Sequence, residues 1–213
     1  MNYDFFKCNF LPKKELWEKV EQFREKFCSD YAYPLNIEFL VEEKLGLDIE
    51  PISGLRELDI DAFLKSDRSG IVVDESRYMD ERNDNRLRFS LAHEIGHFVL
   101  HGYIHDNFNI QIPKDYYNFI TNANNEDYGK FEWQANEFAG RLLVPRYMLI
   151  DEIKKILERI AENDRSLLTY YKKDPFSVLE NASSLCKSFG VSDNVITIRL
   201  QREFDEHFLI TEL

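Results

Sequence analysis

The chain has 213 residues, of which 44% are hydrophobic and 14% aromatic, so it is long enough for a sizeable core and too apolar to be disordered throughout. Its formal net charge of -12 disfavours nucleic acid and anionic membranes as general partners, because both carry like charge. Three scattered cysteines without a C-x-x-C pair disfavour a cysteine zinc site and favour free thiols. No secretory signal is evident, and no apolar run approaches the ~18 residues of a membrane span, so we expect a cytoplasmic protein.

The first half of the chain predicts two helices and two strands. Residues 13–27 ("KKELWEKVEQFREKF") carry apolar side chains at helical spacing, and so do residues 34–46, where Gly46 is the expected stop. Residues 47–52 and 69–75 are short apolar runs with β-branched side chains, which predicts two strands.

The second half is predicted to be mostly helical. After a turn at 81–86, residues 88–101 form a helix, whereas residues 103–130 are rich in Asn, Asp and Tyr and are expected to be a loop with one short helix. Two further helices are predicted over 130–144 and 145–163, and the tail has two helix-like stretches joined at 189–192. The predicted fold class is α+β, with helices dominating.

The motif H-E-x-x-H occurs in the stretch "RFSLAHEIGHFVLH" as His93, Glu94 and His97. In a helix the two histidines lie about 40° apart, so both imidazoles can bind one zinc ion at about 2.0–2.1 Å. Glu94 is offset by about 100° and can flank the metal-bound water. Zinc lowers the pKa of that water toward about 7, and the carboxylate can act as general base when the water attacks a carbonyl.

Apolar residues cover nearly the whole circumference of this helix, which predicts that it is buried. Buried imidazoles and carboxylates are costly unless they are paired, and a metal ion would remove that cost. Gly96 disfavours the helix by about 1 kcal/mol relative to alanine, so we expect another backbone to approach closely there. His101 would lie about 12 Å along the axis from His93 and is expected to support the site or the fold rather than bind the ion.

A catalytic zinc site has three protein ligands and one open position, so we expect a carboxylate from another helix. The best candidate is Glu132, at the edge of the apolar stripe of the helix over 130–144. Asn136 lies one turn later and could hydrogen-bond the outer nitrogen of a zinc-bound histidine. The competing carboxylates are Glu126, Asp127 and Glu137.

Two stretches carry a longer pattern. "RLRFSLAHEIGHFVLH" fits R-x-R-F-x-x-A-H-E-x-G-H, and "FEWQANEFAGRLLVP" fits E-x-x-A-N-x-F-A-x-x-L-L-x-P. Both patterns are those of the ImmA/IrrE family of metallo-endopeptidases, which the chain resembles over roughly residues 34–145. The long 103–130 segment departs from the family and leaves open which residues there line a substrate groove.

The resemblance implies a zincin-like metallopeptidase core over residues 1–144, with a helical C-terminal region over 145–213. It implies one Zn²⁺ per chain, bound by His93, His97 and Glu132, with Glu94 as the catalytic residue. Family members cleave a helix-turn-helix repressor, so the implied partner is a protein substrate of that kind. One further donor would stabilise the oxyanion, and the sequence does not choose among Tyr103, His105, Tyr116, Tyr117 and Tyr128.

The alternative is a DNA-binding or scaffolding transcription regulator that has a zinc site and no peptidase turnover. Residues 181–204 resemble a helix-turn-helix with Gly190 at the turn. Its second helix gains basic residues only at Arg199 and Arg202, whereas a recognition helix offers several. Direct nucleic-acid binding is therefore disfavoured, and a zinc site with no catalysis would not need Glu94. The oligomeric state is not predicted.

Overall fold

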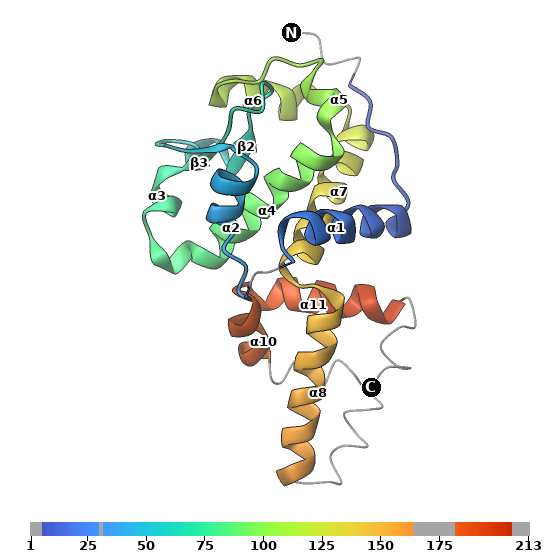
Figure 1. Cartoon of the computed structure of the whole chain (residues 1–213). Helices are drawn as coiled ribbons and strands as arrows, with labels where there is room; N and C mark the ends of the chain where they lie inside the picture. Colours follow the sequence, from blue (N-terminus) through green and yellow to red (C-terminus); the bar gives the residue numbers. More distant parts are fainter. Residues whose placement is uncertain (1–5, 30–31, 164–181, 206–213) are drawn as a thin grey trace. The chain divides into compact units, whose positions relative to one another are not determined.

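A computed structural model of the chain describes residues 6–29, 32–163 and 182–205 (Figure 1). Packing divides the chain into two units, one made of Met1–Tyr31 and Asn36–Leu142 and the other of Ala32–Leu35 and Leu143–Leu213. Helices dominate and a small sheet lies in the first unit, which confirms the α+β class. The boundary at residue 144, as a boundary between domains, stays a prediction.

The sheet of the first unit has three strands in the order β1-β3-β2. The two predicted strands are β1 (Asp48–Ile52) and β3 (Gly70–Asp74), which pair in parallel. The third strand, β2 (Ala62–Leu64), was not predicted and pairs antiparallel with β3. This order places β3 between two edge strands, and all residues of β3 are buried.

The predicted helices of this unit form. α1 (Lys13–Phe27) has the predicted bounds, and the second predicted helix consists of α2 (Ile37–Phe39) and the π-helical turn Leu40–Lys44. Gly46 follows with a φ of 67°, a left-handed conformation that suits glycine at a helix end. α4 (Asp84–Leu100) packs against β2, α2 and α3 (Glu75–Tyr78). Single 3₁₀ turns occupy Arg56–Leu58 and Glu81–Asn83.

The segment 103–130 is mostly helical, so the prediction of a loop there was wrong. It contains α5 (Gly102–His105), α6 (Pro113–Asn122) and the first turns of α7 (Asn125–Leu143). Polar residues hide the helical pattern because only one face of each helix is buried. On that face Phe119 and Phe131 meet Phe6 edge to face, with ring centroids 4.9 and 5.7 Å apart.

The described part of the second unit contains α8 (Arg146–Asn163), α10 (Ala182–Phe189) and α11 (Asp193–Asp205). The last two helices form the predicted corner, with Gly190 at a φ of 62°. Arg199 of α11 is only 2% exposed, forms an ion pair with Glu203, and donates from Nε to the Val144 carbonyl at 3.2 Å. One of the two basic side chains expected on a recognition helix is thus buried within the unit.

The three cysteines are free thiols, as predicted; Cys8 and Cys28 are buried and Cys186 is partly exposed. Among the described residues, no helix has the length and the apolar character needed to cross a membrane.

Candidate metal centre

Three side chains from two helices meet at one point. His93 and His97 lie one turn apart on α4, and their Nε2 atoms are 2.9 Å from each other. Glu132 of α7 places Oε2 3.3 Å from His93 Nε2 and Oε1 3.6 Å from His97 Nε2. Ligand atoms around a tetrahedral zinc lie about 3.3 Å apart, given bonds of about 2.0–2.1 Å. The spacing of these donor atoms therefore fits a single zinc ion.

Both imidazole rings make a hydrogen bond at Nδ1, the ring nitrogen that faces away from the centre of the cluster. His93 Nδ1 lies 3.0 Å from Oδ1 of Asn136, the contact that the sequence predicted for this amide. His97 Nδ1 lies 2.9 Å from Nδ1 of His101, which is one turn farther along α4 and 1% exposed. His101 therefore supports a ring of the cluster and does not join its centre. An imidazole bound at Nδ1 in this way offers Nε2 to a metal.

The charges of the cluster also suit a cation. Burial disfavours a charged imidazole, yet the hydrogen bond and negative charge of Glu132 raise the pKa of His93 to about 9. Burial opposes ionisation of Glu132 as well, but the two histidines hold the pKa of that carboxyl well below its ordinary value. Oε1 of Glu132 is buried and accepts no hydrogen bond from any described residue. A buried acceptor in this position, facing two imidazole nitrogens, fits a metal ligand.

Glu94 lies beside this cluster, and one ligand atom each from His93, Glu94 and His97 fit within 4.8 Å of one another. The Glu94 carboxylate is 3% exposed and accepts a hydrogen bond from the main-chain N–H of Leu64 in β2 at 2.8 Å. Burial raises the pKa of Glu94 to about 7. A carboxyl with that pKa, held by a fixed donor, suits a general base that works near neutral pH.

At Gly96 the backbones of α4 and α7 approach each other closely. A β-carbon at this position would lie 3.0 Å from Cα and 3.1 Å from the carbonyl oxygen of Ala135, and 3.2 Å from Cβ of Phe138. The close backbone approach predicted for Gly96 is thereby confirmed. It brings Glu132, three residues before Ala135, to the histidines.

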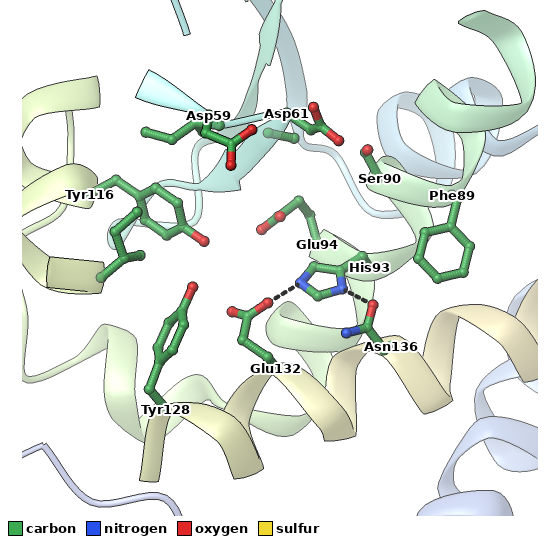
Figure 2. A pocket seen from close by; sticks show the side chains of 13 residues that line it. Asp59, Asp61, Phe89, Ser90, His93, Glu94, Tyr116, Tyr128, Glu132 and Asn136 are labelled. Atoms are coloured by element: carbon green, nitrogen blue, oxygen red, sulfur yellow. Dashed lines mark hydrogen bonds and ion pairs between the residues drawn. The ribbon is translucent and has the colours of Figure 1, made fainter. Parts of the chain in front are cut away.

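The cluster lies in a pocket of the first unit, and Figure 2 shows Tyr116, Tyr128, Glu94 and Glu132 directed into it. The remaining lining comes from the segment that enters β2 and the first residue of β2, from α4, from α6 and from α7. Those residues are Asp59, Ile60, Asp61, Ala62, Phe89, Ser90, His93, Ile120 and Asn136.

Of the four predicted oxyanion donors whose side chains the structure describes, two line this pocket, Tyr116 and Tyr128. The Tyr103 hydroxyl donates instead to the carbonyl of Lys7 at 3.4 Å, and Tyr117 lines a separate hollow with Ile112. His105 is the last residue of α5, and its side chain lies outside the described part of the structure.

The competing carboxylates of α7 have other partners. Glu126 pairs with Lys130 at 2.7 Å, Asp127 pairs with Lys7 at 3.3 Å, and Glu137 accepts from Trp17 Nε1 at 2.8 Å. Among these four carboxylates, only Glu132 reaches His93 and His97.

Sequence reasoning missed two parts of the site. One is the pocket wall formed by residues before β2, and the other is Gln134, which hydrogen-bonds His101. Asp61 lines the pocket and pairs with Arg77 at 2.6 Å and Arg86 at 2.8 Å. The sequence signal for this ion pair was Arg86, which belongs to the family pattern. Gln134 accepts from His101 at 3.1 Å, and no sequence feature indicated that contact.

Comparison with known proteins gives one family. The chain matches the M78 peptidases, described as the IrrE N-terminal-like domain, over residues 77–201, which is more than half of its length. The matched region contains α4 and α7 with the whole cluster. Neither the curated proteins nor the solved structures give a match. The family match and the motif in α4 agree, and the chain belongs to the M78 peptidase family of the ImmA/IrrE type.

Proposed function

We propose that the protein is a zinc-dependent endopeptidase with one Zn²⁺ bound by His93, His97 and Glu132. The observation that carries the proposal is the convergence of three donor groups, with an adjacent carboxylate that does not need to bind the ion. When bound, zinc would lower the pKa of a coordinated water and polarise the substrate carbonyl. A site without catalysis would have no use for the buried Glu94.

Glu94 acts as the general base in this proposal. Its hydrogen bond from Leu64 N–H fixes the carboxylate beside the cluster, so that one oxygen accepts from the main chain. The carboxylate takes a proton from the attacking water and can return it to the leaving amine. A pKa of about 7 serves both steps near neutral pH.

Tyr116 and Tyr128 are the proposed donors to the oxyanion. Burial raises the pKa of both hydroxyls, and the nearby charge of Glu132 raises it further. Both groups therefore stay protonated at neutral pH and can donate a hydrogen bond to developing negative charge. Exchange of each tyrosine for phenylalanine would identify the donor, because the donor variant loses kcat with little change in KM.

The outer edge of β2, which pairs with no other strand in the described part of the chain, offers a place for the substrate main chain. Asp61 and Lys65 are hydrogen-bonded to β3, so the main-chain groups of Ala62 and Leu64 point away from that strand. The Leu64 N–H binds Glu94, while Ala62 lines the pocket. A peptide in extended conformation could pair with Ala62 and pass the metal cluster. This supports a polypeptide substrate rather than a small amide.

We further propose a helix-turn-helix repressor as the substrate. The resemblance to the ImmA/IrrE family implies this class, and a net charge of -12 favours a partner with a basic surface. The DNA-binding alternative gains no support from α11, where Arg199 is buried against Glu203.

The test combines metal analysis with a Glu94→Gln variant. Wild type and variant should each bind about one zinc, and only the wild type should cleave a candidate repressor. Glu126→Gln, which changes an exposed carboxylate on α7, is the matched control and should cleave like the wild type. A wild-type protein that binds no zinc, or a Glu94→Gln variant that cleaves as well as the wild type, would contradict the mechanism.

A further inference from the structure

Gln134 lies behind the metal cluster and touches two parts of the first unit. It is located on α7, two residues after Glu132, and is 3% exposed. Its amide nitrogen donates to the main-chain carbonyl of Asn9 at 2.7 Å, and its amide oxygen lies 3.1 Å from Nε2 of His101. A chain of hydrogen bonds therefore runs from the N-terminal segment through Gln134 and His101 to His97.

The Asn9 carbonyl fixes the direction in which hydrogen bonds are donated along this series of residues. A main-chain carbonyl can only accept, so the Asn9 carbonyl holds the NH₂ end of Gln134 and turns Oε1 toward His101. Nε2 of His101 must then carry the hydrogen. Because a neutral imidazole has one N–H, Nδ1 of His101 accepts, and His97 Nδ1 donates to it at 2.9 Å. The Nε2 lone pair of His97 then faces His93 and Glu132.

The opposite arrangement is costly at this place. If His97 carried its hydrogen on Nε2, two lone pairs would face each other between the Nδ1 atoms of His97 and His101. Gln134, His97 and His101 are all at most 3% exposed, so water has little access to compensate for a lost hydrogen bond. Oε1 of Gln134 thus decides between a His97 ring that presents a lone pair to a metal and one that presents an N–H.

We infer that Gln134 is a positioning residue of the metal centre, which fixes the tautomer of His97 through His101 and is itself oriented by the Asn9 carbonyl. The inference rests on the proposed function only in taking His97 as a ligand. Its central claim concerns the metal-free protein and can be tested without activity.

The experiment compares wild type with two variants at this position and one control. Gln134→Met fills a similar space and removes the acceptor, whereas Gln134→Glu, in the protonated form that this buried position favours, keeps an acceptor for His101 and a donor for the Asn9 carbonyl. Glu137→Met is the matched control, because it removes a buried hydrogen bond from α7, that of Trp17, without touching the histidines. Long-range ¹H–¹⁵N spectra of the metal-free proteins report the histidine tautomers, and titration with Zn²⁺ gives the dissociation constant.

Wild type should show His97 protonated at Nδ1 and His101 at Nε2. Gln134→Met should give mixed tautomers and bind Zn²⁺ about 10–100-fold more weakly, while Gln134→Glu restores the wild-type tautomer of His97. Glu137→Met should lower thermal stability alone. An Nε2–H tautomer of His97 in the wild type, an unchanged Gln134→Met variant, or an equal loss in Glu137→Met would overturn the inference.

Two results separate this inference from the proposed function. A wild type that takes up no Zn²⁺ contradicts the zinc peptidase, while the metal-free spectra still decide the role of Gln134. If Gln134→Met does not fold, the wild-type spectrum and Gln134→Glu give the decision. A Gln134→Glu variant with mixed His97 tautomers would then count against the inference.

Discussion

Gly96→Ala is expected to weaken the metal centre through the packing of two helices. The added methyl group would lie 3.0 Å from Cα of Ala135, whereas ordinary carbon contacts are about 3.5–4.0 Å. The obstructing atoms are mainly the backbone of α7, so the helix itself must withdraw by about 0.5 Å or more. Glu132 moves with it, and zinc sites tolerate only about 0.2 Å in ligand distance.

Two opposing effects set the stability of this variant. Alanine favours the helix by about 1 kcal/mol relative to glycine, while overpacking of a close contact costs about 1–3 kcal/mol. We therefore expect a net loss between about 0 and 2 kcal/mol, together with zinc affinity at least about tenfold lower, which is about 1.4 kcal/mol. Chemical unfolding and Zn²⁺ titration measure the two quantities.

The matched control is Gly129→Ala on α7, where an added β-carbon would meet no atom within 4 Å apart from its chain neighbours and the nearby backbone of its own helix. This variant should gain about 0.5–1 kcal/mol in stability and bind Zn²⁺ like the wild type. If Gly96→Ala gains stability in the same way and keeps its zinc affinity, the close contact does not hold Glu132 in place, and the reasoning is refuted.

Three further predictions follow from individual side chains. Because the pKa of His93 is raised to about 9 in the metal-free protein, Zn²⁺ must displace a proton at pH 7, and the affinity for Zn²⁺ should rise about tenfold per pH unit from 7 to 9. Calorimetry in buffers of different ionisation enthalpy measures the released proton, and an affinity that does not change with pH would contradict this prediction. Glu132→Gln keeps the shape but removes the charge of the third ligand, so Zn²⁺ affinity measured with a competing chelator should fall about 100-fold or more, and an unchanged affinity would exclude Glu132 as a ligand. Burial raises the pKa of Cys28 to about 11, so its thiol should react with a disulfide reagent at pH 8 about 100-fold more slowly than a free thiol, and fast labelling of the folded protein would show that Cys28 is not buried.

The sequence predicted those parts of the fold that depend on local periodicity. The helix 13–27 has its predicted bounds, and β1 and β3 lie where short apolar runs were found. β2 escaped because three residues are too few to show an alternating pattern, and its existence depends on pairing with β3. The segment 103–130 escaped because its helices are stabilised by a few aromatic contacts with distant residues such as Phe6.

In the candidate site, too, the residues related by helical spacing were predictable, whereas the groups that depend on contacts between distant segments were not. His93, Glu94 and His97 were predictable because one helical turn brings them together, and Glu132 and Asn136 lie one turn apart on α7. The donor to Glu94 is a main-chain group of β2, so no side chain in the sequence could indicate it. Tyr116 and Tyr128 could not be distinguished from the other candidates before the helices of residues 103–130 were known.

The position of β2 beside Glu94 also affects how the proposed peptidase would select a cleavage site. Leu64 and Ala62 are two residues apart, and along a strand the same face recurs every two residues, or about 6.8 Å. A peptide paired with this edge could slip by two residues and present equivalent side chains, whereas a slip of one would turn each side chain to the other face. The proposed peptidase could therefore bind an extended substrate in registers that differ by two residues, while Glu94 keeps a fixed position beside the strand.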